Sequence, residues 1–197
     1  MSKLALDRLS AKFGDAVLET HSDFGDDTAV VRPERWREIC AWLRSDPAMS
    51  FDMLVDLCGV DYPDREPRFE VVLHLYSIDK RHRLRLKARV GDAEGEGATI
   101  DTVTSVWAGA DWFERETWDM MGISFRGHPD LRRILMYPEF EGHPLRKDYP
   151  AQKTQPLVPY RTEEEAGLPL GKLAPFRDDE GMPFGRKTWS PDDSKPS

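Results

Sequence analysis

The sequence predicts an α+β fold, in which a small mixed or antiparallel sheet of about four to five strands packs with helices and is followed by an extended, proline-rich C-terminal arm. Three observations predict this fold. Apolar and polar residues alternate in residues 68–90, as they do in strands. Residues 36–43 carry apolar side chains at helical spacing. Ten of the 15 prolines lie in residues 138–197, and such a region forms little helix or sheet.

The first fifty residues indicate two helices and two strands. A short opening helix is predicted from Leu6, Leu9 and Phe13. Residues 16–21 and 28–32 are predicted as strands around a turn at 24–27. Pro33 suits a first helical position. The helix that follows ends at residues 45–47, and its i, i+3, i+4, i+7 stripe consists of Trp36, Ile39, Cys40 and Leu43.

Three further strands are predicted at residues 51–57, 68–78 and 83–90, the last two joined as a hairpin across 79–82. Residues 68–78 are partly apolar on both sides, which indicates an inner strand covered on both faces. In residues 83–90 every second side chain is basic and points outward. Such a row is typical of a solvated or edge-protecting face, and contact with an acidic neighbour is the alternative. The row consists of Arg83, Arg85, Lys87 and Arg89.

Residues 101–107 are predicted to form one turn of helix, and residues 111–121 a longer helix. Asp111 and Glu114 have the spacing of a capping box at its start, and Gly122 suits its C-terminal end. Arg115 and Asp119 are i, i+4 partners on this helix. One shared face is predicted for Trp112, Phe113, Thr117, Met120 and Met121.

We predict a compact domain over residues 1–125 and an extended arm over residues 126–197. The arm contains large aromatic residues, which a bare solvated tail does not need, so we interpret them as anchors on a partner. The pattern of residues 162–165 predicts a single capped turn of helix. The proposed anchors are Phe140, Tyr149, Tyr160, Phe176, Phe184 and Trp189.

Composition argues against several classes of function. A net charge of -8 and a pI near 5.2 disfavour nucleic acid as the main partner, because phosphate binding needs a basic face. Cys40 and Cys58 form no CxxC pair, so they are interpreted as structural thiols, and a four-cysteine iron–sulfur site cannot be built from them. No apolar run approaches the roughly 18 residues of a membrane span. The N-terminal residues do not have the pattern of a signal peptide.

Catalysis is the alternative interpretation of the charged residues near the end of the predicted domain. Glu114 and Glu116 point to different faces of a helix, so they form no close carboxylate pair. Ion pairs with nearby arginines explain the carboxylates more simply. His128 and His143 are fifteen residues apart, which is poor zinc-ligand spacing. The acid–base or metal cluster that this alternative requires is Glu114, Glu116, Asp119 and His128.

Two basic clusters lie further on, at Arg132-Arg133 and at Arg146-Lys147 beside Asp148. Clusters of this kind bind a phosphate or lipid headgroup, or, more often, dock on an acidic protein surface through bidentate arginine bonds. The sequence contains no glycine-rich nucleotide loop and no serine-hydrolase motif.

Two long motifs, ERExWDxxGIxFxxHPDLRRIL at residues 114–135 and YPEFEGHPLRKDYP at 137–150, resemble the signature of one family. It is the C subunit, of 30-kDa type, of the proton-pumping NADH:quinone oxidoreductase, respiratory complex I. Residues 54–62 and 68–77 fit that family too, so the resemblance spans about residues 30–150. Met121 departs from it, because phenylalanine is more frequent there in the family. Another large apolar residue at this position changes nothing in the assignment.

The resemblance implies a subunit of the peripheral arm, beside the quinone-cavity subunit and the iron–sulfur subunits, on the cytoplasmic side of a bacterial inner membrane. It implies no catalytic, cofactor-binding or metal residues in this chain, with FMN and iron–sulfur clusters in partner subunits. The alternatives are the same module in a membrane-bound hydrogenase or ferredoxin-linked quinone reductase, and a free-standing acid–base enzyme using Glu116 and His128.

The resemblance also implies structural and interface residues. Residues 114–119 are expected to fix the final helix against the loop that holds Arg132 and Arg133, and residues 144–150 to begin the arm that contacts neighbouring subunits. The full set is Glu114, Arg115, Glu116, Asp119, Gly122, His128, Pro129, Asp130, Arg132, Arg133, Leu145, Arg146, Lys147, Asp148 and Pro150.

Overall fold

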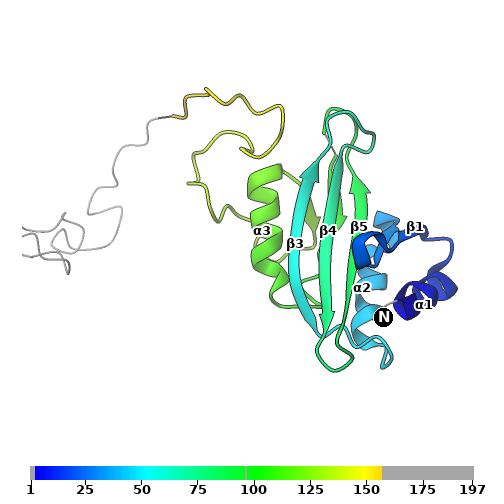
Figure 1. The fold of residues 1–197 in the computed structure, drawn as a ribbon. Helices are drawn as coiled ribbons and strands as arrows, with labels where there is room; N and C mark the ends of the chain where they lie inside the picture. The colour runs from blue at the N-terminus through cyan, green and yellow to red at the C-terminus, as the bar shows by residue number, and fades with distance from the viewer. Residues whose placement is uncertain (1–2, 96, 157–197) are drawn as a thin grey trace, which may run out of the picture. The chain divides into compact units, whose positions relative to one another are not determined.

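The computed structural model describes residues 3–95 and 97–156 and shows the predicted α+β fold (Figure 1). Its main sheet has five strands in the order β1-β2-β5-β4-β3. Strands β2 and β5 are parallel and the other neighbours are antiparallel, so the sheet is mixed. The strands are β1 (Val17–His21), β2 (Thr28–Val31), β3 (Met53–Asp61), β4 (Phe69–Ser77) and β5 (His82–Val90).

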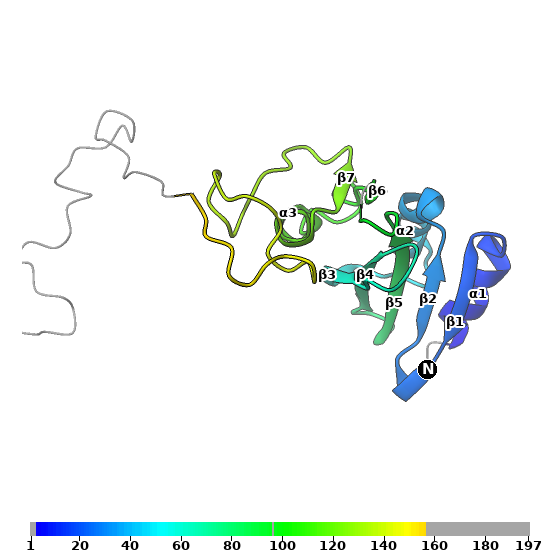
Figure 2. The same ribbon diagram turned by 90° about the horizontal axis from the view of Figure 1, so that it is seen from above.

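Helices pack on this sheet from one side, and α3 lies beside β3 (Figure 2). A second, two-stranded parallel sheet pairs β6 (Thr99–Asp101) with β7 (Ser124–Arg126). The helices are α1 (Lys3–Phe13), α2 (Trp36–Ser45) and α3 (Ala110–Met121), with short 3-10 turns η1 (Asp23–Gly25) and η2 (Pro33–Arg35).

The alternation of β4 and β5 places one side of each strand in the core. Leu73 lies opposite Leu86, and Leu75 lies opposite Leu84; all four are essentially inaccessible to solvent. Each such side chain contributes roughly 1.5–3 kcal/mol when buried. The predicted stripe of α2 covers the same face, because all of its members are buried in this core: Trp36, Ile39, Cys40 and Leu43.

The outer side of the sheet is only partly buried. Strand β4 lies between β3 and β5, as an inner strand should. On its outer side Glu70 and Val72 are buried, but His74 and Tyr76 are only half-buried. The prediction of cover on both faces is therefore wrong for the C-terminal half of β4.

The basic row of β5 does not protect an edge, because β5 pairs with β2 on one side and β4 on the other. Part of the row meets acidic neighbours, as the alternative required. Arg85 pairs with Asp26 at 2.9 Å, and Lys87 pairs with Glu70 at 2.8 Å. Glu70 also lies 3.5 Å from Arg89.

Residues 101–107 contain the predicted turn of helix, because the N–H groups of Val106 and Trp107 both donate to the Val103 carbonyl, at 2.8 and 2.9 Å. Residues 99–101, before this turn, form strand β6, which was not predicted from the sequence, and Ile100 lies opposite Phe125 of β7. Both side chains are buried in the core. The segment is extended because it pairs with a strand more than twenty residues later, which local periodicity does not reveal.

After β7 the chain runs beside α3 without helix or strand as far as residue 156 (Figure 1). The described residues up to Pro156 belong to one compact unit. Phe140 and Tyr149, two of the proposed anchors, stack on each other with ring centroids 6.1 Å apart. The other proposed anchors and the predicted turn at 162–165 lie outside the described residues. Docking of residues 126–197 on partner subunits stays a prediction.

Within residues 3–95 and 97–156, no helix combines the length and apolarity needed to cross a membrane. Both cysteines are free thiols: Cys40 is buried in the core, and Cys58 is half-buried in β3. Burial raises the pKa of each thiol above its ordinary value, so neither is activated as a nucleophile.

Candidate functional site: the charge cluster around helix α3

Helix α3 begins without the predicted capping box. Its N-cap is Gly109, and no side chain caps the helix there. Glu114 is instead fully buried, and its carboxylate accepts hydrogen bonds from the Thr102 hydroxyl at 2.5 Å and the Val103 N–H at 2.7 Å. It therefore joins the middle of α3 to the segment after β6. At the other end Gly122 has φ +79°, the left-handed conformation predicted for a helix stop.

A histidine and two carboxylates meet at the start of α3. His128 has a fully buried side chain, and its Nε2 lies 3.2 Å from Asp111 Oδ1 and 3.9 Å from Glu114 Oε2. Its Nδ1 accepts the backbone N–H of Asp130 at 3.1 Å, so the hydrogen-bond network assigns the proton of the neutral ring to Nε2. Burial raises the pKa of Glu114 to about 7, and Asp111 adds to this.

Asp119 has the opposite electrostatic environment. Its Oδ2 accepts three consecutive backbone N–H groups at 2.9–3.0 Å, and Arg133 donates to Oδ1 at 2.6 Å. Burial alone would raise the pKa of Asp119, but these donors outweigh it, so the pKa lies below its usual value. The three N–H groups belong to Ile134, Leu135 and Met136.

The predicted ion pair between Arg115 and Asp119 is absent, because Asp119 is bound to Arg133 and the N–H groups after it. Arg115 donates instead to the backbone carbonyls of Arg132 at 3.2 Å and Arg133 at 3.3 Å. Arg115 and Asp119 thus both hold the loop over residues 132–136 against α3, whereas Glu114 binds a different segment.

Arg133 extends this cluster into the chain that follows. It donates to the carbonyls of Phe140 at 2.8 Å and Gly142 at 3.1 Å. Its guanidinium also lies over the rings of Trp118 and Phe140. Beside it, His143 Nδ1 lies 3.0 Å from the carbonyl oxygen of Asp119. One arginine therefore fixes the path of residues 133–142 around the end of α3.

A second arginine closes the C-terminal end of α3. Arg146 Nε donates to the Met121 carbonyl at 2.7 Å, one of the carbonyls that the helix itself leaves unsatisfied. The guanidinium lies 5.1 Å from the centroid of Phe69 in β4. The N–H of Leu145 donates to the Met120 carbonyl at 3.0 Å.

Sequence reasoning missed a buried ion pair that holds residues 147–148. Arg68 binds Asp61 through two bonds, at 2.7 and 2.9 Å, and binds Asp148 at 3.0 Å. Asp61 also accepts the N–H of Lys147 at 2.7 Å. The bond from Arg68 is the first cause of the lowered pKa of Asp61 and of Asp148. One signal was available: Asp61 lies opposite Phe69, at an inward position where alternation predicts an apolar residue.

The remaining predicted residues lie at the surface. Glu116 is exposed on α3, and Asp130 forms a 2.9 Å pair with Arg132 in which both side chains are largely solvent-accessible. The predicted set therefore contains residues with buried side chains and residues with exposed side chains. The exposed ones also include Pro129, Leu145, Lys147 and Pro150. Within the described ranges no three His, Cys, Asp or Glu side chains form a group that could hold a metal ion.

Comparison with known proteins first places the fold. A chain in a solved structure titled "Structure of the membrane-bound sulfane sulfur reductase (MBS), an archaeal respiratory membrane complex" superposes with a TM-score of 0.64 and 22% identity, covering 77% of this chain and 86% of that one. At this identity the likeness concerns the fold alone.

The sequence comparisons then place the family. The model described as "Respiratory-chain NADH dehydrogenase, 30 Kd subunit" matches residues 29–155. A protein of Rhizobium etli (strain CIAT 652), named as NADH-quinone oxidoreductase C subunit 2, is 50% identical over 139 residues, 71% of this chain and 72% of the relative. The NADH-quinone oxidoreductase C subunit of Roseiflexus sp. (strain RS-1) is 50% identical over 145 residues, 74% and 82% of the two chains. The chain belongs to the family of 30-kDa subunits of respiratory-chain NADH dehydrogenase.

Proposed function

We propose that this chain is a non-redox structural and assembly subunit in the peripheral arm of a proton-translocating NADH:quinone oxidoreductase. In this role it supports electron transfer from NADH through the FMN and iron–sulfur clusters of partner subunits to quinone, and holds no cofactor itself. Its relatives named as NADH-quinone oxidoreductase C subunits, at 50% identity, support the proposal.

The proposal rests on one structural observation: charged residues of the two motifs bind the backbone of this chain itself. Asp119, Arg133 and Arg146 all bind backbone groups of this chain. They fix the shape of residues 131–149 on α3, which is what a docking surface requires. Large apolar side chains on α3 and this segment remain exposed, as at interaction sites. They are Trp112, Leu135, Tyr137 and Leu145.

The partners under this proposal are the quinone-cavity subunit and the iron–sulfur subunits of the peripheral arm. The chain is then a peripheral protein on the cytoplasmic side of the inner membrane, held there through those subunits. Partners of this kind match these apolar side chains better than a small ligand does, because the side chains are 38–62% exposed, whereas a pocket encloses most of a small ligand.

The second candidate is the same module in a related membrane-bound complex, a hydrogenase or a ferredoxin-linked quinone reductase. This candidate is supported by the similar fold of a chain in an archaeal respiratory membrane complex. The 22% identity of that chain, against 50% for the relatives named as NADH-quinone oxidoreductase, favours the first candidate.

A tagged pull-down from detergent-solubilised native membranes tests the proposal. We expect flavin- and cluster-bearing subunits in the eluate, together with NADH:quinone reductase activity. Hydrogenase partners without NADH oxidation would establish the second candidate instead. Recovery of the chain alone would contradict both.

A further inference from the structure

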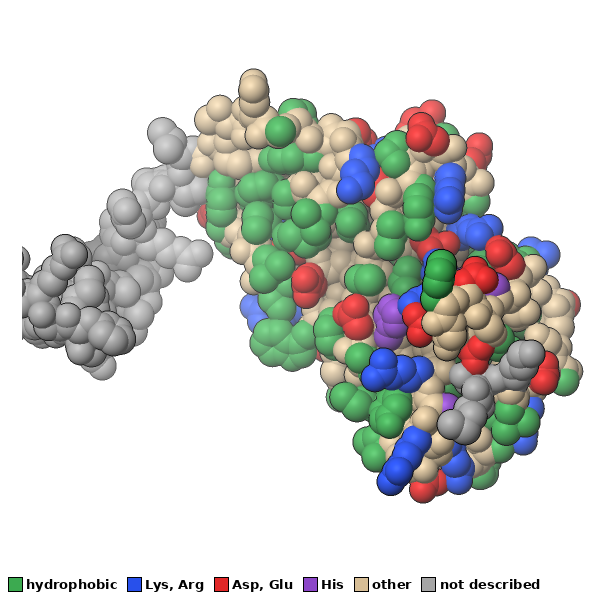
Figure 3. Space-filling view, in the orientation of Figure 1, with side chains coloured by type: hydrophobic (Ala, Val, Ile, Leu, Met, Phe, Trp, Pro, Cys, Tyr) green, Lys and Arg blue, Asp and Glu red, His purple; other side chains and the backbone are tan. Residues whose placement is uncertain are grey.

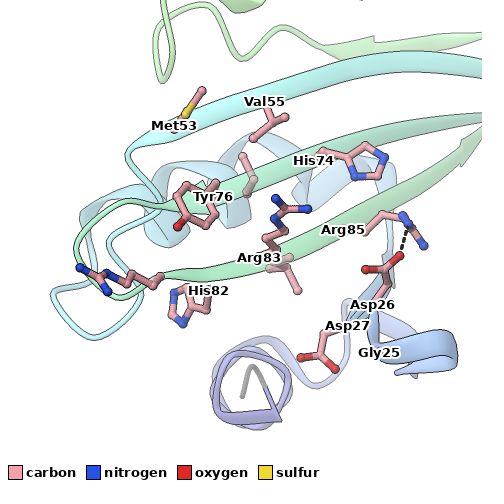
Figure 4. A pocket seen from close by; sticks show the side chains of 13 residues that line it. Gly25, Asp26, Asp27, Met53, Val55, His74, Tyr76, His82, Arg83 and Arg85 are labelled. Atoms are coloured by element: carbon pink, nitrogen blue, oxygen red, sulfur yellow. Dashed lines mark hydrogen bonds and ion pairs between the residues drawn. The ribbon is translucent and has the colours of Figure 1, made fainter.

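The outer side of the main sheet carries a hollow that the α3 cluster does not use. Figure 4 shows it between the β4–β5 hairpin, the start of β3 and the loop before β2. The hollow has a volume of about 680 Å³. We call it the open sheet face and define it by Met53, Val55, His74, Tyr76, Arg83 and Arg85.

The open sheet face has basic side chains without acidic partners. Arg85 is neutralised by Asp26 at 2.9 Å. Arg83 is exposed, and its one contact with a charged or aromatic group in the described chain is with the Tyr76 ring, 5.8 Å from the centroid. Arg81, in the adjoining turn, is exposed too, and no carboxylate within residues 3–95 or 97–156 pairs with it. Within the described residues two guanidinium groups thus lack a carboxylate partner, although the full sequence has a net charge of -8.

Apolar side chains border these arginines. Met53 and Val55 are 46% and 45% exposed on β3, which is an edge strand of the sheet. Tyr76 lies beside them, since it is opposite Met53 in the strand register. Figure 3 shows hydrophobic, basic, acidic and histidine side chains close together on this side of the molecule. Arginine, tyrosine and methionine are enriched at protein interfaces.

We infer that the open sheet face docks an acidic segment of a partner protein, with carboxylates on Arg81 and Arg83 and apolar side chains against Met53, Val55 and Tyr76. The inference goes beyond the proposed function but rests on the part of it that places the chain in a multi-subunit assembly. A nucleic acid fits less well, because the basic row further along β5 is already paired with Glu70. A lipid surface would call for a larger cluster of free basic residues than two.

Site-specific cross-linking in the assembled complex tests this inference. A photoreactive phenylalanine analogue replaces Met53 in the full chain, and the complex is purified by a tag, irradiated and analysed by mass spectrometry. We expect a cross-link to a segment of another subunit that is rich in Asp or Glu. Arg83→Glu should lower the cross-link yield at least about ten-fold, because it places like charges together.

The matched control is Arg44→Glu, which makes the same charge change at an exposed position of α2, on the helix that covers the opposite side of the sheet. It should change the yield by less than about two-fold. Arg83→Gln removes the charge without reversing it and should also lower the yield. Thermal unfolding of each variant chain checks that it folds.

The inference is overturned by the absence of a Met53 cross-link in a complex that contains the chain, while the proposed function would stand. Cross-links to a lipid, a nucleic acid or the chain's own residues also overturn it, as does an Arg83→Glu yield equal to that of the unsubstituted arginine. If the chain enters no assembly, both proposals fail together.

Discussion

Glu114 shows how a single buried carboxyl makes stability depend on pH. It is fully buried, and its pKa rises from an ordinary value of 4.5 to about 7. The folded state therefore binds more protons than the unfolded state between these values. Because the free energy of unfolding falls with pH wherever the folded state holds the extra proton, ionisation of Glu114 destabilises the fold as pH rises through this window.

We predict that Glu114→Gln removes this pH dependence. The amide keeps the size of the side chain and an oxygen that can accept the Val103 N–H. The difference in free energy of unfolding between variant and wild type should shift in favour of the variant by up to about 3 kcal/mol between pH 4.5 and 7. Urea titrations across this range measure it.

Only the difference in free energy of unfolding between wild type and Glu114→Gln reports on Glu114, because burial also lowers the pKa of His74 and His143. Lowered histidine pKa values make stability rise with pH below about 6.5, the opposite slope. A constant difference across the window would show that Glu114 titrates at its ordinary pKa.

Asp119 is a second buried carboxylate on the same helix, and we predict that Asp119→Asn destabilises the chain by about 2–4 kcal/mol. The amide cannot supply two ionised oxygens to three N–H groups and Arg133. Glu116→Gln, an exposed change of the same kind on α3, should stay within about 0.5 kcal/mol. Equal effects of the two variants in chemical denaturation would contradict the buried ion pair.

At the scale of elements, the sequence predicts what local spacing determines. Alternation placed Leu73 and Leu86 inside the sheet, and the i, i+3, i+4 pattern placed Trp36 in the core, because side-chain direction follows backbone period. The capping box of α3 was wrong and strand β6 was missed for a shared reason. Glu114 is drawn into the core by Thr102 and Val103, and β6 is formed by pairing with β7, contacts that no local window contains.

The same limit applies to the candidate site. The motifs identify the charged residues, but the i, i+4 rule pairs Arg115 with the wrong partner. The rule considers only contacts within one helix, whereas Asp119 binds Arg133, fourteen residues later in the chain. Arg68 and Asp148 are 80 residues apart, so their contact follows from tertiary structure alone.

The end of α3 provides a prediction at this scale. Gly122→Ala should lower the free energy of unfolding by at least about 1–2 kcal/mol, because the residue has φ +79°. An added Cβ would also lie 2.6 Å from His143 and 2.7 Å from Arg146. Gly109→Ala, at the other end of the helix, has φ -64° and no atom within 4 Å of the new Cβ.

Thermal unfolding of both glycine variants provides the comparison. The Gly109 variant should unfold within a few degrees of the wild type, whereas the Gly122 variant should unfold earlier. Equal melting temperatures would mean that the end of α3 and residues 143–146 accommodate the new Cβ without loss of stability.

For the whole molecule, the segment after β7 is fixed by bonds of two kinds. Arg146 binds the Met121 carbonyl and therefore completes α3, so its removal affects the fold as well as any interface. Asp148 is different, because its side chain is 56% exposed and its partner Arg68 keeps two bonds to Asp61. Asp148 can therefore separate an interface role from a folding role.

We predict that Asp148→Ala leaves the melting temperature of the chain within a few degrees, since Asp61 still neutralises the buried Arg68 through two bonds, yet lowers the yield of assembled complex. If Asp148 becomes buried against a partner, truncating its pair with Arg68 costs about 2–5 kcal/mol of binding. Glu38→Ala is the matched control, because Glu38 on α2 pairs with Arg35 and is 59% exposed. If Asp148→Ala lowers both the melting temperature and the yield of complex, Asp148 acts in folding. If the yield of complex is unchanged, residues 146–150 do not belong to the docking surface.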